Sequence, residues 1–169
     1  MMRERTHQQR RLSRFARCER GTQLIELAIT LPVLLLMFAA VAEFGRYFYT
    51  YATLAKATRA GARYLTTVPV KAGGANPTED PKAKRLVIYG DPNADGTSTP
   101  VAPGLGESNV RIVREGGAGV VPATVRVEII NYNYAPLINL GKVSGRGSWL
   151  DVPVKPGTTM RYLLITPSV

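Results

Sequence analysis

The residues of this chain that are best placed to support specific chemistry lie at one junction near its start. Gly21 is followed by Thr22, and the carboxylate of Glu26 stands at the beginning of an uncharged apolar run, Leu27–Ala42. A charged side chain in apolar surroundings is costly unless it finds a partner, and it is therefore a sign of function. The junction predicts a chain that is cut after Gly21 and then assembled through its own apolar helix.

The positive charge of the chain is concentrated in front of this run. The 169-residue chain has a formal net charge of +10, and residues 1–21 hold seven arginines against two glutamates. Arginine-rich flanks stay cytoplasmic, so we expect the N-terminus inside and the residues after roughly 46 outside. Nucleic-acid binders instead cluster Lys and Arg on a folded face, often within a recognisable motif, so no nucleic acid is expected as a partner.

The only cysteine, Cys18, and the only histidine, His7, both precede Gly21. If the leader is removed, the remaining chain can form no disulfide and no Cys/His or Ser/His/Asp constellation. We therefore expect no enzyme activity and no cofactor. Cys18 does not fit a lipoprotein site, because Phe15-Ala16-Arg17 is not the small apolar stretch that such a site needs.

One long helix is expected over residues 22–66. Leu27–Ala42 spans about 24 Å as a helix, short of a bilayer core. Leu24 and Ile25 before it and the aromatic residues after it extend the expected membrane span to about residues 23–46. Pro32 should kink this helix near Thr30.

The part of the helix beyond the span is rich in alanine. Ala57 and Gly61 form a pair of small residues four apart, a spacing that lets helices approach closely. Plain helix propensity explains the composition of Thr50–Leu65 equally well. The helix should end before Pro69.

The residues at the junction resemble a known family. Gly21, Thr22 and Glu26 are similar to the processing site of type IV pilins and pseudopilins. The longer run from Arg20 to Leu36 resembles the TadE-like family, the pseudopilins of the tight-adherence (Tad/Flp) pilus. Two more segments complete the pattern, Glu43-Phe44-Gly45-Arg46 and Ala57–Tyr64. The resemblance covers roughly residues 20–65, and it is weaker in three outer segments: Tyr89–Pro92, Pro103–Leu105 and Thr159–Tyr162.

The resemblance implies a role for particular residues. A prepilin peptidase would cut after Gly21, and Glu26 would help to dock the helix by pairing with the free amino terminus, Thr22, of a neighbouring subunit. The implied helix-packing residues are Pro32, Glu43, Gly45, Ala57 and Gly61. The implied protein is a minor pseudopilin of the bacterial inner membrane, with a cytoplasmic N-terminus and a periplasmic C-terminal domain. Its partners would be the peptidase, the other pilins and pseudopilins, and the inner-membrane assembly platform of a pilus that serves adhesion and biofilm formation.

Two other interpretations stay open. The chain could be a single-pass anchored protein whose outer domain binds a ligand without being polymerised. Alternatively, Ala40-Val41-Ala42 fits a signal-peptidase site, and cleavage there would release a soluble protein that begins at Glu43. Against release, the leader would be unusually long, and Glu26 interrupts the approach to the apolar core.

The outer part, residues 67–169, is expected to complete an α+β fold in which a small antiparallel sheet packs on the outer half of the helix. Residues 66–82 read as a linker, and Asp80-Pro81 should cap a short helix over Lys82–Tyr89. A strand at Leu86–Tyr89 is the alternative. Residues 90–108 are expected to form a loop.

Three strands are expected, at Asn109–Arg114, Ala123–Tyr134 and Thr159–Thr166. Gly116–Gly119 would connect the first two as a hairpin, and Trp149 would pack in the core. In the second strand the alternation predicts one buried face, formed by Val125, Val127 and Ile129, and a solvated face with Arg126 and Glu128.

One segment resembles the first half of a calcium loop. Asp91, Asn93 and Asp95 have the spacing of its ligands, and Gly96 follows them. The twelfth position is Ala102 instead of glutamate, and the same residue types build ordinary turns. The segment is therefore a weak candidate for a metal site.

Overall fold

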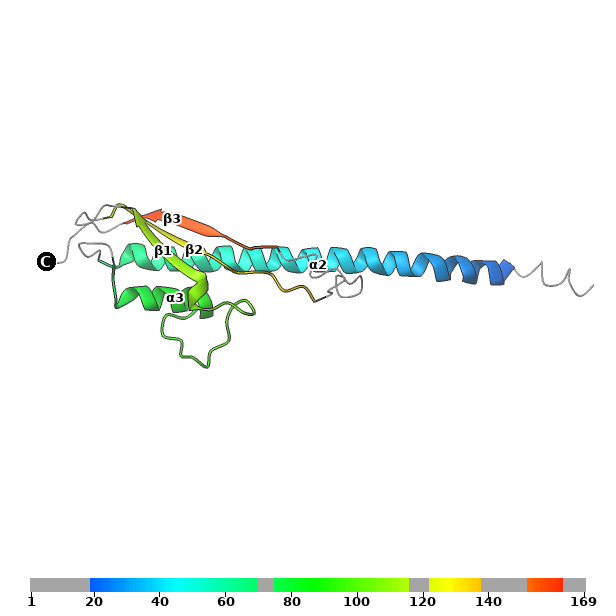
Figure 1. Ribbon diagram of the computed structural model, residues 1–169, viewed down its shortest axis with the longest axis horizontal. Coiled ribbons are helices and arrows are strands. Elements are labelled where there is room, and N and C mark those ends of the chain that lie inside the picture. Colours follow the sequence, from blue (N-terminus) through cyan, green and yellow to red (C-terminus); the bar gives the residue numbers. More distant parts are fainter. Residues whose placement is uncertain (1–18, 70–74, 116–121, 138–151, 163–169) are drawn as a thin grey trace, which may run out of the picture. The chain divides into compact units, whose positions relative to one another are not determined.

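The computed structural model describes residues 19–69, 75–115, 122–137 and 152–162 (Figure 1). Its helices are α2 (Glu19–Thr67) and α3 (Glu79–Tyr89), with a 3-10 turn, η1 (Glu107–Asn109), and its strands are β1 (Val110–Glu115), β2 (Thr124–Ile129) and β3 (Gly157–Arg161). The chain divides into two compact units, Met1–Ala42 and Glu43–Val169. Residues 1–18 of the leader, which include His7 and Cys18, lie outside the described residues, as do the Gly116–Gly119 connection and Trp149.

The expected long N-terminal helix is confirmed as α2, which continues through Pro32. In the first unit its apolar side chains are exposed: Leu24, Ile25, Leu27, Ile29, Leu31, Val33, Leu34, Leu35, Leu36, Met37, Phe38 and Val41. The helix ends where Thr66 and Thr67 turn their hydroxyls back to the carbonyls of Arg63 and Tyr64, at 2.7 and 2.8 Å. The residues Thr66-Thr67-Val68 are poor helix formers and Pro69 follows them, so the helix ends at this point.

The second unit contains the expected antiparallel sheet, with strand order β1-β2-β3. Val127 of β2 lies opposite Ile112 of β1 on one side and Thr158 of β3 on the other. Because side chains alternate along a strand, this register places every second residue of the three strands on one face. The expected α+β class is therefore confirmed.

The inward face of the sheet packs on the outer part of α2. Val125, Val127 and Ile129 of β2 are at most 1 % exposed, as the alternation predicts, and they share a core with Leu54 and Leu65 of α2. The hydroxyl of Thr58, fully buried on α2, lies 3.3 Å from that of Thr158 on β3. Thus α2 supplies one wall of the domain core.

Helix α3 is the expected short helix, but Asn76 is the residue that satisfies its first N–H groups. Asn76 Oδ1 accepts hydrogen bonds from the backbone N–H groups of Thr78 and Glu79, at 3.3 and 3.2 Å. The Asp80 carboxylate in turn accepts a hydrogen bond from the N–H of Asn76 at 3.3 Å. Thr78 occupies the N-cap position and makes no side-chain cap bond, so Asn76 is the residue that satisfies these N–H groups. The prediction that Asp80-Pro81 caps the helix is wrong, as is the alternative of a strand at Leu86–Tyr89.

The second strand is shorter than predicted. β2 ends at Ile129, not at Tyr134, because the chain leaves the sheet at Asn131, whose φ is 52°. Asn109 Nδ2 holds this corner by donating to the carbonyls of Ile130 and Asn131, at 3.2 and 2.9 Å. Asparagine tolerates the left-handed region better than the other non-glycine residues do.

The solvated position predicted for Glu128 is wrong. Glu128 is only 8 % exposed, although it lies on the outward face of β2 beside the exposed Arg126. Arg126 Nε donates to its carboxylate at 2.9 Å, and Arg111 of β1 binds the same carboxylate. Gly157 of β3 faces the Glu128 Cβ, and a Cβ added there would lie 3.1 Å away. The two arginines therefore cover the Glu128 carboxylate, and the lack of a side chain at Gly157 leaves room for the Glu128 side chain.

Candidate functional site

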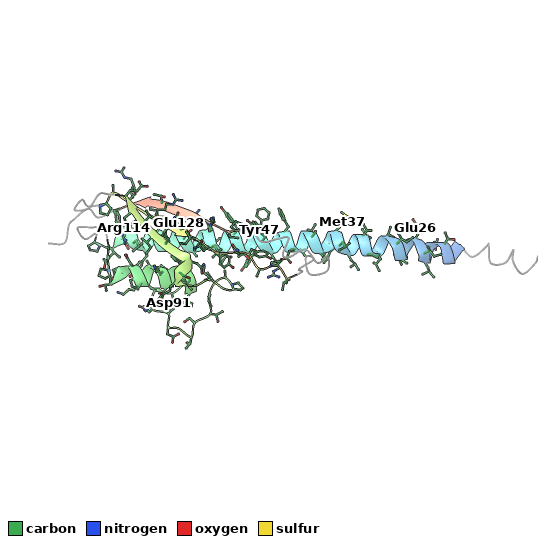
Figure 2. All side chains as sticks on the ribbon, in the orientation of Figure 1. Glu26, Met37, Tyr47, Asp91, Arg114 and Glu128 are labelled. Atoms are coloured by element: carbon green, nitrogen blue, oxygen red, sulfur yellow. The ribbon has the colours of Figure 1, made fainter. Side chains whose placement is uncertain are left out.

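The processing residues lie in the first two turns of α2. Gly21 is partly exposed, and Thr22 and Glu26 are exposed. Figure 2 shows Glu26 near the start of α2 and Met37 farther along the same helix. Within the described residues the Glu26 carboxylate makes no hydrogen bond or salt bridge; only its backbone carbonyl accepts one, from the hydroxyl of Thr30 at 2.5 Å. An exposed carboxylate on an apolar helix is thus available to a group from outside the described chain.

Glu43 differs from Glu26 in that its carboxylate is satisfied within the chain. It is 6 % exposed, accepts a hydrogen bond from the Tyr134 hydroxyl at 2.7 Å, and accepts another from the Leu137 backbone N–H at 3.1 Å. The Tyr47 ring stacks edge-on against Tyr134, with ring centroids 5.5 Å apart. Glu43 therefore joins the segment after β2 to α2.

The electrostatics of this contact favour a neutral tyrosine. Burial and the hydrogen bond to Glu43 raise the pKa of Tyr134 to about 12, and the nearby Arg46 works in the opposite direction. Tyr134 therefore remains a proton donor across the physiological range. Among the described residues, the buried Nη1 atom of Arg46 has no hydrogen-bond partner.

Gly61 lies in close contact with other segments of the same chain. A Cβ at this position would clash with the Val87 side chain of α3, and it would lie 3.5 Å from the Ala83 carbonyl oxygen and 3.7 Å from Val127 Cγ1. Ala57 also packs, partly buried, against the same core. The helix that approaches Gly61 is therefore α3. Whether another subunit also uses the pair stays a prediction.

Gly45 is the opposite case. It is exposed, and a Cβ added there would meet nothing within 4 Å. Pro32 lies inside the exposed apolar part of α2. Neither residue has a packing role among the described residues, so their predicted role in packing against other helices stays a prediction.

The contrast between the two glycines gives a test by matched variants. Gly61→Ala should lower the free energy of unfolding by about 1–3 kcal/mol, because the added methyl group overpacks against Val87. Gly45→Ala adds the same methyl group in open space and should stabilise the helix by up to about 1 kcal/mol. Thermal unfolding of the full-length protein in detergent measures both. Equal losses of stability in the two variants would contradict the close approach of α3 to Gly61.

The candidate calcium residues lie in a series of turns after α3. Asp91 Oδ1 accepts from the N–H of Asn93 at 2.9 Å, and Asp95 Oδ1 accepts from Thr97 and Ser98. These bonds lower the pKa of Asp95, with the Thr97 hydroxyl as the largest cause. In the described ranges, no three His, Cys, Asp or Glu side chains come together in a way that could hold a metal ion. The carboxylates of Asp91 and Asp95 therefore accept hydrogen bonds within these turns.

Two polar clusters were not predicted from the sequence. Arg114 of β1 binds both carboxylate oxygens of Asp80, at 3.1 and 2.5 Å, and donates to the Tyr162 hydroxyl at 2.8 Å. On α2, the Tyr64 hydroxyl donates to Glu79 at 2.5 Å, which raises the pKa of Tyr64 to about 12 and lowers that of Glu79. Both clusters join residues far apart in sequence, and no local spacing signals them.

A cavity of about 380 Å³ opens between α3, η1 and β1. Its charged lining residues include Asp80 and Arg111. The first is bound to Arg114 and the second to Glu128, so these charges are already neutralised. Lys84 and Glu107 are the other charged residues of the lining.

These features define a protein with one N-terminal helix that is long and apolar enough to cross a membrane, followed by a small α+β domain. Residues 21–63 match the family model of the TadE-like protein, so the family resemblance is confirmed over this segment. The match includes Gly21, Thr22, Glu26 and Gly61, and ends before the three outer segments with the weaker resemblance. None of the curated proteins and none of the solved structures matches the chain.

Proposed function

We propose that this protein is a TadE-like minor pseudopilin, cut by a prepilin peptidase after Gly21 and taking part in the assembly of a Tad/Flp adhesion pilus. The family match over residues 21–63 supports this function. The observation that carries it is the exposed apolar surface of α2 in the first unit, which includes an exposed carboxylate at Glu26. Such a surface requires a membrane or the helices of other subunits.

The position of Gly21 suits a cut in a helical segment. Gly21 lies in the first turn of α2, and glycine weakens a helix interior by about 1 kcal/mol relative to alanine. A peptidase that needs an extended substrate can therefore unwind this turn at low cost. The cut would leave Thr22 with a new ammonium group, about one helical turn before Glu26.

The new ammonium group and Glu26 are complementary. A carboxylate in an apolar environment is stabilised when a positive charge pairs with it, and a single buried charge without a partner is strongly destabilising. Pairing Glu26 of one subunit with Thr22 of its neighbour satisfies both groups. The same pairing sets the axial register between two helices that carry no charged side chain over residues 27–42.

Glu26→Gln tests this pairing. The variant keeps the size and hydrogen-bonding capacity of the side chain but removes its charge, so we expect normal cleavage and a loss of most surface pili. Pili are counted by electron microscopy in cells that carry only the variant, and the precursor-to-mature ratio is measured on a gel. Glu19→Gln is the matched control, because it removes a carboxylate from the leader that cleavage discards.

Three outcomes would contradict the proposal. Normal pilus numbers with Glu26→Gln would show that the carboxylate is dispensable after processing. Pili that form normally in cells lacking the whole protein would instead favour the alternative, an anchored binding protein that takes no part in assembly. Equal pilus loss in both glutamine variants would indicate an effect unrelated to pairing.

A further inference from the structure

The segment after β2 is fastened to α2 at Glu43. The Tyr134 hydroxyl and the Leu137 N–H both bond to the Glu43 carboxylate, and Tyr134 stacks on Tyr47. Residues 134–137 form neither helix nor strand. An irregular backbone of this kind is therefore held beside the helix at the level of Glu43.

This contact limits how far the membrane span can extend. Irregular backbone exposed to lipid does not occur within the hydrocarbon region, because its polar groups cannot be satisfied there. Residues 134–137 must therefore lie at or beyond the edge of the hydrocarbon, and so must Glu43. The span then ends at Ala42, four residues before the limit of about 46 that the sequence predicts.

The length of helix up to this point agrees with a bilayer. Residues 21–42 number 22 and lie between Arg20 and Glu43 on the continuous helix α2. At 1.5 Å per residue they span about 33 Å, close to the roughly 30 Å of a hydrocarbon core. In the uncut chain, Arg20 and Glu43 therefore mark the two edges.

Apolar side chains are exposed at the outer edge. Leu137 is 74 % exposed beside Glu43, and Phe44 and Phe48, which stack edge-on with centroids 4.7 Å apart, are 60 % and 54 % exposed on the helix. The Leu137 side chain lies at the level of Glu43, on a segment whose backbone is anchored to α2. At this level lipid headgroups meet acyl chains. Aromatic residues are enriched at the same depth.

We propose that the α+β domain itself inserts into the outer surface of the bilayer, through Leu137 of the anchored segment together with Phe44 and Phe48 of α2. The occupant of this surface is phospholipid, because the exposed aromatic pair follows the exposed apolar residues 27–42 directly in the sequence. Glu43 is the residue that fixes Leu137 at the correct depth, through its bond to the Leu137 N–H. The domain is thus held against the membrane at a second point.

Spin-label depth measurements on the full-length protein test this proposal. In a Cys18→Ser background, single cysteines replace Phe38, Phe44, Tyr51, Leu137 or Val113, each partly or largely exposed, and each carries a nitroxide. The protein is placed in vesicles of phosphatidylethanolamine and phosphatidylglycerol. Collision with oxygen, which concentrates in lipid, is compared with collision with a water-soluble nickel complex.

The helix labels provide a depth scale, since Phe38 lies about 9 Å deeper than Phe44, and Tyr51 about 10 Å farther out. The Leu137 label should have the same depth as the Phe44 label and an oxygen-to-nickel ratio several-fold above that of Val113 on β1. Thermal unfolding checks that each labelled protein is folded.

A Leu137 label as accessible to nickel as the Val113 label would overturn the proposal. So would shielding of Leu137 from both reagents that grows with the protein-to-lipid ratio, because it would show that a second copy covers the surface instead of lipid. Neither result depends on cleavage or on a pilus, so the outcome is independent of the proposed function.

Discussion

Gly21→Leu is expected to leave nearly all of the protein as the uncut precursor in the membrane. Leucine blocks the close approach of the backbone to the peptidase, and it also strengthens the first turn of α2 by about 1 kcal/mol relative to glycine. Both effects oppose unwinding at the cut. The measurement is the precursor-to-mature ratio on a gel, where the two forms differ by the 21 residues of the leader.

Gly45→Leu is the matched control for this experiment. It makes the same replacement in the same helix, at an exposed glycine with open space around its Cβ position. Cleavage of this variant should be normal. If Gly21→Leu were processed as fully as Gly45→Leu, cleavage after Gly21 would be excluded.

Val127→Asp is expected to unfold the outer domain and to cause its loss from the cell envelope. Val127 is 1 % exposed and lies in the core between the sheet and α2. An unpaired carboxylate there costs several kcal/mol, against a total stability of roughly 5–10 kcal/mol for a domain of this size. The only cysteine of the chain is Cys18, so no internal disulfide compensates. Steady-state levels by immunoblot measure the effect.

Val113→Asp makes the same chemical change on the other face of the sheet. Val113 is 37 % exposed and lies directly opposite Arg126 of β2, so the new carboxylate gains a partner of opposite charge. The variant should accumulate to near-normal levels. Similar levels of the two variants would contradict the observed strand register. Arg126→Asp is a poorer control, because it removes a partner of the largely buried Glu128.

The features that follow from local patterns could be predicted from the sequence. Uninterrupted apolar residues predicted α2, and the alternation of Val125, Val127 and Ile129 predicted the buried face of β2. Each of these signals repeats with the period of its own element, so it is visible without knowledge of the rest of the chain.

The predictions that failed concern features that depend on contacts between distant segments. The sequence predicted that Glu128 is solvated, because its partner Arg111 lies seventeen positions earlier in the chain. Glu43 and Tyr134 are 91 positions apart, and no local spacing indicates that one binds the other. At α3 two Asx-Pro pairs compete, and only the hydrogen bonds of Asn76 decide between them. Local propensity cannot rank such alternatives.

The N-terminal sequence of the protein purified from its native membrane tests the central claim most directly. Mass spectrometry of the terminal peptide should show a chain that begins at Thr22, which is the result expected from a prepilin peptidase. A chain that begins at Met1 or Met2 would contradict processing and favour a simple membrane anchor. A chain that begins at Glu43 would show release by signal peptidase and would remove the apolar helix on which the proposed function rests.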